Sequence, residues 1–260
     1  MEIIELDLID LAIAVGLIII AIGLSAWQQL GLEWNLTRAT GQAILQLLFL
    51  GYFLELIFSL NESVKLLGVL VFFVAMLTIT SIVTRNRISQ KIPWVLPVVW
   101  GSIFISTAIT VLYTNFLIIQ PEKWYEPRYL IPLAGIVLGS AMNSAAIAGE
   151  RLVSSINDRQ LEIETHLSLG STPVQAIAKY RKEAIRFAVF PILNQMMIVG
   201  LGTLPVLSSG QILGGVTPLN AVAYEIVIII MLAFANLLTT LLITQGLWRQ
   251  FFNSTDQLIR

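Results

Sequence analysis

Long apolar stretches dominate this sequence and limit what it can fold into. A helix needs about 20 apolar residues to cross a bilayer. Seven stretches approach or exceed that length, at 8–27, 39–60, 65–84, 94–119, 130–150, 184–206 and 219–247. Charged residues make up only 12% of the chain, against about 25% in soluble domains. We therefore predict an all-α, multi-pass protein of the cell membrane, with residues 1–260 forming a single transmembrane domain of about seven helices.

The basic residues predict how these spans are oriented. With the N-terminus outside, twelve Lys and Arg residues fall in inside segments, whereas only Lys65, Lys123 and Arg128 fall outside. Because inside segments of membrane proteins are enriched in Lys and Arg, we predict an outside N-terminus and an inside C-terminus. The first span is preceded by acidic residues and by no basic ones, unlike a secretory signal, so we expect it to be retained. These acids are Glu2, Glu5, Asp7 and Asp10.

Residues 151–186, called the polar segment here, form the one long hydrophilic stretch, and the orientation places them in the cytoplasm. Gly170 supplies a helix stop. Thr172, Pro173 and Gln175 then predict a new helix, with a threonine N-cap, a proline at the first helical position and a glutamine that closes a capping box. The helix before the stop carries an apolar stripe, made of Leu152, Ile156, Ile163 and Leu167.

The polar segment thus predicts a helix, a sharp turn at 169–172, called the elbow here, and a second helix that continues into the sixth span. An elbow held between two long helices could transmit a movement from the cytoplasm into the membrane. An ordinary loop with amphipathic ends is the alternative interpretation.

Polar side chains inside the apolar spans are candidates for a transport path. A carboxylate or amide in hydrocarbon is costly, so such residues usually face a cavity or a partner. We select Gln46, Asn143, Asn194 and Glu225. For the glutamate, the alternative is a neutral side chain or one that reaches the membrane interface.

Two further features each allow two interpretations. The uncharged, Gly- and Ser-rich loop at 204–218 is either a gate that re-enters the membrane or a plain reverse turn. The small-residue face that begins with Gly135 and Gly139 packs helices either within one chain or between two chains.

Several kinds of chemistry have no support in the sequence. There is no GxxxxGK[ST] phosphate loop, so we expect this chain not to be an enzyme and to bind no cofactor. With no cysteine and His166 as the only histidine, a soft metal site is not expected, and any metal that passes must be handled by oxygen ligands. The net charge of −1 gives no support to a nucleic-acid partner.

Four stretches together resemble a known family. They are GQAILQLLFLGYFLELIF at 41–58, IPLAGIVLGSAMNSA at 131–145, LSLGSTPVQA at 167–176 and VGLGTLPVLSSGQILGG at 199–215. The chain resembles the membrane subunit of FetB-type ABC transporters, the iron-export permeases, together with the plant aluminium-sensitivity membrane proteins. It departs from the family pattern LPGMM, because residues 204–208 read LPVLS.

The resemblance implies a permease that exports a metal cation such as iron, with ATP bound by a separate ATPase subunit and with two copies of each subunit. It also implies that the polar segment couples to the ATPase. The coupling residues would be Glu162, Glu164, Leu169, Gly170, Thr172 and Pro173. A permease for a small organic substrate such as a nucleotide sugar, an ion-driven transporter and a membrane scaffold that transports nothing remain as alternatives.

Overall fold

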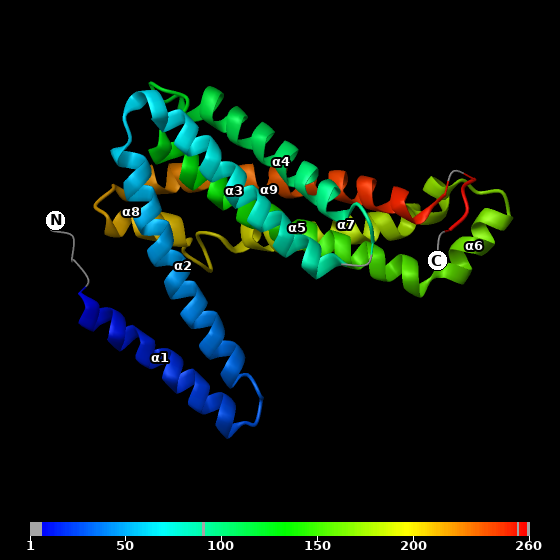
Figure 1. Cartoon of the computed structure of the whole chain (residues 1–260), viewed down its shortest axis with the longest axis horizontal. Helices are drawn as coiled ribbons and strands as arrows, with labels where there is room; N and C mark the ends of the chain where they lie inside the picture. The colour runs from blue at the N-terminus through cyan, green and yellow to red at the C-terminus, as the bar shows by residue number, and fades with distance from the viewer. Residues whose placement is uncertain (1–6, 90–91, 254, 259–260) are drawn as a thin grey trace. The chain divides into compact units, whose positions relative to one another are not determined.

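The computed structural model describes residues 7–89, 92–253 and 255–258, and these residues form helices joined by short turns (Figure 1). Among them there is no β-strand, only two isolated bridges, so the predicted all-α class is confirmed. Four charged residues used in the predictions about the first span and the orientation lie outside the described residues. They are the acids Glu2 and Glu5 and the basic residues Lys91 and Arg260. The elements are α1 (Leu8–Trp27), α2 (Glu33–Ser59), α3 (Glu62–Ile88), α4 (Val95–Tyr113), the π-helix η1 (Thr114–Ile119), α5 (Pro127–Asp158), α6 (Gln160–Ser168), α7 (Pro173–Ile198), α8 (Val206–Leu213), α9 (Pro218–Trp248) and the 3₁₀-helix η2 (Arg249–Phe251).

The described residues divide into two compact units. Unit 1 holds α1, α2 and the first turns of α3, up to Gly68, together with residues 213–215. In the turn between α1 and α2, the Ser25 hydroxyl donates a 2.8 Å hydrogen bond to the Glu33 carboxylate and accepts one of 3.2 Å from the backbone N–H of Leu32. Most side chains of α1 and α2 are exposed in this structure, as expected of apolar helices whose neighbour is lipid.

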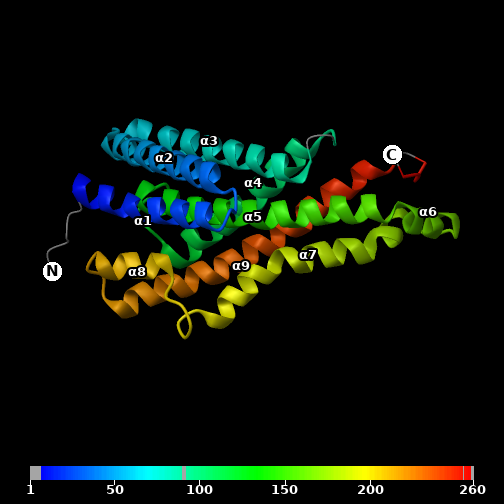
Figure 2. The same cartoon turned by 90° about the horizontal axis from the view of Figure 1, so that it is seen from below.

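Unit 2 is a bundle organised around α5, which packs against α4, α7 and α9. Figure 2 shows α5, α7 and α9 running side by side, with α6 at one end where the polar segment turns back. The face of α5 at these contacts consists of small residues, and Ala141, Ala145 and Ala148 are fully buried. Small side chains let helix backbones approach closely, which favours helix association in a membrane.

The small-residue face that begins with Gly135 and Gly139 was predicted to allow close helix approach. In unit 2, the glycines that come closest to another helix are different ones. A Cβ atom on Gly149 would collide with Ile88 of α3 and would lie 3.2 Å from Leu247 of α9. A Cβ atom on Gly139, by contrast, would meet no atom within 4 Å. The small-residue face that follows Gly139 therefore packs within the chain, whereas Gly139 itself makes no close approach to another helix.

Buried hydroxyl and amide groups join α9 to its neighbours. The Asn236 side-chain oxygen accepts hydrogen bonds from Ser140 at 3.0 Å and Ser144 at 3.2 Å, which connects α9 to α5. Thr239 donates a 2.6 Å bond to Ser106 on α4. A polar group in an apolar interior is costly unless it is hydrogen-bonded, so these bonds specify how the three helices align.

Six of the helical segments in the described part of the chain are long and apolar enough to cross a membrane, which confirms a multi-pass membrane protein. They correspond to all of the predicted spans except 184–206. That span coincides with the end of α7, whose first half is charged and whose apolar part, 187–198, is shorter than the roughly 20 residues of a full crossing. The number of crossings and their orientation stay predictions.

Candidate functional site

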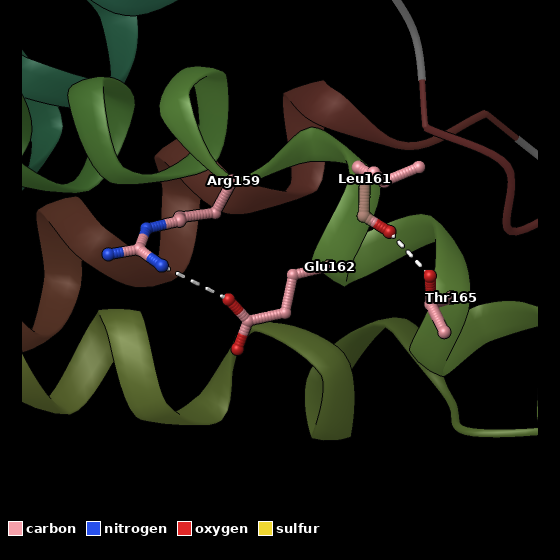
Figure 3. Close-up of polar contacts among 4 residues, drawn as sticks. All are labelled: Arg159, Leu161, Glu162 and Thr165. Carbon is pink, nitrogen blue, oxygen red and sulfur yellow. Dashed lines mark hydrogen bonds and ion pairs between the residues drawn. The ribbon is translucent and has the colours of Figure 1, made fainter.

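The polar segment begins as a direct continuation of α5. The predicted span 130–150 extends without a loop as far as Asp158, and the helix then breaks at Arg159, whose φ and ψ are −119° and 26°. Figure 3 shows the Arg159 guanidinium reaching across this break to the Glu162 carboxylate, at 3.5 Å. An exposed pair of this kind contributes little to stability, but it joins the ends of α5 and α6.

The elbow closes α6 in the way that Gly170 predicts. Gly170 has a φ of +89°, a conformation that costs a residue with a side chain about 1–2 kcal/mol. The backbone N–H of Ser171 donates to the carbonyl of His166 at 3.0 Å, and that of Gly170 donates to Leu167 at 2.9 Å. This pair of bonds is the Schellman motif, which satisfies the last carbonyls of a helix.

The restart after the elbow is also confirmed. The Thr172 hydroxyl accepts from the backbone N–H of Gln175 at 3.4 Å, and the Gln175 side chain accepts from the backbone N–H of Thr172 at 2.9 Å. Pro173 is buried at the first helical position of α7. The two ends of the elbow are therefore held by local hydrogen bonds, which makes it a fixed turn rather than a loose loop.

Residues 251–253 and 255–258, called the C-terminal segment here, pack against the polar segment, which the sequence did not predict. Phe251 and Phe252 are buried in the same cluster as Ile156 and Ile163 of the predicted stripe, and Leu258 packs against that cluster. The side chain of Asn253 accepts hydrogen bonds from the backbone N–H groups of residues 255 and 257, at 3.0 and 2.8 Å, which closes the turn. The one sequence feature that could have indicated this packing is the aromatic pair Phe251 and Phe252 after the last span.

Large apolar side chains are exposed around the elbow. Leu161 on α6 is 79% exposed and Leu169 at the elbow is 78% exposed, although the surrounding surface is polar. Val174, in the first turn of α7, is also exposed. Leu161 is not part of the predicted apolar stripe, because it lies off the buried face of α6. Together these three apolar side chains make this end of the molecule a candidate contact site for another protein.

The two candidate glutamates of α6 have different surroundings. Glu162 faces Arg159 and lies near the buried hydroxyl of Tyr180, which makes no hydrogen bond within the described residues. Burial, and then the Glu162 carboxylate, raise the pKa of Tyr180. Glu164 instead lines a groove between α6 and the C-terminal segment, beside Ser168 and Gln257. The two glutamates are both half-buried but face different neighbours.

The four path candidates lie on four helices. Asn143 on α5 accepts a 3.3 Å hydrogen bond from Arg87, so its amide oxygen already has a partner. Asn194 on α7 is half-buried, and Gln46 is exposed on α2 in unit 1. Glu225 on α9 differs from all of them, because one carboxylate oxygen is buried and makes no hydrogen bond within the described residues. Glu225 is thus the candidate whose surroundings best suit a passing cation.

The loop after α7 is not a plain reverse turn. Residues 206–213 form the short helix α8, and the Glu225 carboxylate faces the backbone of Ser208 in its first turn. A helix N-terminus presents free N–H groups and a partial positive charge, which favour a nearby carboxylate. The interpretation of 204–218 as a simple turn is therefore wrong, whereas its role as a gate stays a prediction.

No group of three or more His, Asp and Glu side chains in the described residues could hold a metal ion.

The sequence of this chain matches a known family over nearly its whole length. Residues 8–252 match the family described as "Uncharacterised protein family (UPF0014)". The chain belongs to the UPF0014 family. The expected resemblance to iron-export and aluminium-sensitivity proteins is confirmed by named relatives in this family. No solved structure is significantly similar to this UPF0014 chain.

Relatives of this UPF0014 chain cover it almost end to end. A UPF0014 membrane protein of Synechocystis is 48% identical over 98% of both chains. The probable iron export permease protein FetB of Escherichia coli is 32% identical, over 96% of this chain and 94% of its own. The protein ALUMINUM SENSITIVE 3 of Arabidopsis thaliana is 31% identical, over 95% of this chain and 88% of its own.

Proposed function

We propose that this chain is the membrane-spanning permease subunit of an ABC transporter, energised by a separate ATPase subunit. The observation that carries the proposal is the elbow. Its two ends are held by local hydrogen bonds, and it lies between α6 and the long helix α7. Leu169 of the elbow and Leu161 of α6 are exposed on a polar surface. Such a surface suits a groove on a partner. In this proposal the chain itself hydrolyses no ATP, and ATP binds to the partner.

The coupling step follows from the helix connections. α5 runs without a loop from the membrane to Asp158, and α7 returns directly from Pro173. When ATP brings two ATPase subunits together, a force on the elbow acts on both helices as levers. The Schellman motif and the capping box keep the elbow from absorbing the movement. Two permease copies, each with its ATPase, would form the transporter, with residues 1–260 of each acting as one domain.

A metal cation such as iron, moved outward, is the substrate that we propose. The name of the Escherichia coli relative, a probable iron export permease, supports it. The buried oxygen of Glu225 also supports it, because hard cations prefer oxygen ligands such as carboxylates. The path would run past Gln46, Asn143, Asn194 and Glu225. A small organic substrate such as a nucleotide sugar, or a scaffold that moves nothing, would show different results in the experiments below.

Replacing both exposed leucines by aspartate should release the ATPase subunit. L161D/L169D removes the apolar contact and places two charges at the docking surface, so we expect at least tenfold less ATPase to copurify from native membranes. Because both side chains are exposed, the melting temperature should change little. L201D/L204D is the matched control, since both of its leucines are exposed away from the polar segment.

An unchanged yield of ATPase with L161D/L169D would remove this surface from the docking site. If no ATP-hydrolysing subunit copurifies with the unaltered chain, the scaffold and the ion-driven transporter become the better explanations.

Glu225→Ala should impair export while leaving the ATPase bound. Loss of the carboxylate removes the anionic oxygens from the path, and we expect export of the preferred cation to fall at least tenfold. The measurement is ATP-dependent transport of Fe²⁺, Mn²⁺, Al³⁺ and a nucleotide sugar by inside-out vesicles. Asn194→Ala tests a neighbouring candidate in the same assay. Normal export by Glu225→Ala would exclude Glu225 from the path.

A further inference from the structure

A groove with basic side chains along it lies between α9 and the part of the polar segment that forms the first half of α7. Its volume is about 270 Å³. The apolar part includes Ile177 of α7 and Leu241 and Trp248 of α9, and the basic part consists of Arg181, Lys182 and Arg186. The groove is therefore apolar and strongly positive at once, a combination that suits an amphipathic anion.

The positive charge in this groove is not neutralised by the chain. No Asp or Glu is among the described residues that line it. Arg181 donates hydrogen bonds to the Thr244 hydroxyl at 3.2 Å and to the Leu241 carbonyl at 3.4 Å, but both acceptors are uncharged. Burial, and then the nearby charge of Arg249, lower the pKa of Arg181.

Lys182 and Arg186 add to this excess. They are exposed, and they lie four residues apart on one face of α7, where like charges repel each other. Neither makes a salt bridge or hydrogen bond with another described residue. An anion between them would relieve the repulsion.

A neighbouring cleft between α5 and α7 shows the contrast. It contains three basic residues, Arg151, Arg159 and Lys179, but Asp158 and Glu183 line the same cleft. Its cations therefore already have carboxylate neighbours, and it has no comparable excess of positive charge. The groove beside α9 is the one that lacks a counter-charge.

The position of the groove along α9 indicates its depth in the membrane, and therefore which anions can reach it. A helix of the length of α9, Pro218–Trp248, spans roughly 46 Å, whereas the hydrocarbon core of a bilayer is about 30 Å thick. A crossing of about 20 residues that starts near Pro218 would thus leave the hydrocarbon near Leu238, about one turn before Leu241. The groove at Leu241 therefore opens at the level of the lipid headgroups.

We propose that this groove binds an anionic glycerophospholipid, with its phosphate between Arg181, Lys182 and Arg186 and an acyl chain along Ile185 and Leu241. Basic pockets between transmembrane helices bind anionic headgroups in this way. The site requires only the membrane and this chain. A failure of lipid binding would leave the ATPase result unaffected, and the reverse also holds.

The test measures lipid binding to the purified full chain by native mass spectrometry, with phosphatidylglycerol against phosphatidylcholine. We expect the unaltered chain to prefer phosphatidylglycerol and K182Q/R186Q to bind it at least tenfold more weakly. This double variant leaves the hydrogen bonds of Arg181 intact, so it should fold. R151Q/K179Q is the matched control, because it removes the same amount of positive charge from the neighbouring cleft between α5 and α7, and it should retain the binding.

Each outcome decides the proposal. Loss of binding in K182Q/R186Q alone supports it. Equal loss in both double variants would show general charge attraction and would overturn the site, as would a lack of preference between the two lipids. A third arm adds inorganic phosphate at millimolar concentration. If phosphate displaces the lipid and binds equally well by itself, the groove takes a free phosphate and the lipid proposal fails.

Discussion

Gly170→Arg is expected to reduce ATP-driven transport at least tenfold. Gly170 has a φ of +89°, so a side chain there costs about 1–2 kcal/mol in the elbow. The new side chain would also project from the turn beside Leu169, where the ATPase would dock. Both effects act on the geometry of the elbow, and transport by vesicles that hold the chain and its ATPase measures them together.

Gly31→Arg is the control for backbone strain. Gly31 has a φ of +70°, and no atom lies within 4 Å of its Cβ position, as at Gly170. It belongs to the turn between α1 and α2, far along the chain from the polar segment. We expect both variants to lose similar stability and only Gly170→Arg to lose transport. If transport falls equally in both, strain alone explains the effect and the elbow has no special role.

Gly149→Val is expected to be the most destabilising of these single changes. The added Cβ would collide with Ile88 of α3 and press on Leu247 of α9. Overpacking of this kind typically costs roughly 1–3 kcal/mol, which corresponds to a fall in melting temperature of several degrees for a chain of this size. The measurement is thermal unfolding of the purified chain in detergent.

Gly139→Val provides a matched control on the same helix. It has the same change in helix propensity, but its Cβ position is open. We expect its melting temperature to stay close to that of the unaltered chain. A large loss of stability at Gly139 would mean that this glycine contacts a second permease copy, and it would restore the interpretation that the small-residue face joins two chains.

The position of Gly149 shows what the sequence could not predict about how the helices pack. The GxxxG spacing selected Gly135 and Gly139, yet the close approach is at Gly149. A glycine pattern indicates that some helix pair can approach closely, but it does not state which face meets which helix. That choice depends on residues such as Ile88 and Leu247, which lie far from Gly149 in the chain.

The path candidates show the same limit. Asn143 and Asn236 are both amides within apolar helices, and only their neighbours separate them. The Asn236 side chain accepts hydrogen bonds from Ser140 and Ser144, whereas that of Asn143 accepts one from Arg87. Glu225 was selected because a carboxylate in an apolar span is costly, and its position beside the first turn of α8 could not be foreseen, because that helix was expected to be a loop.

The sequence by itself determined the membrane-helix class and the local form of the elbow. Apolar length decides whether a helix can cross a bilayer, and the Schellman motif and the capping box join residues no more than five positions apart. Only the tertiary structure decided that Leu161 and Leu169 stay exposed, that residues 251–253 and 255–258 pack beside the polar segment, and that α7 and α9 enclose a basic groove. Exposure and grooves arise from contacts between distant segments, which no local pattern contains.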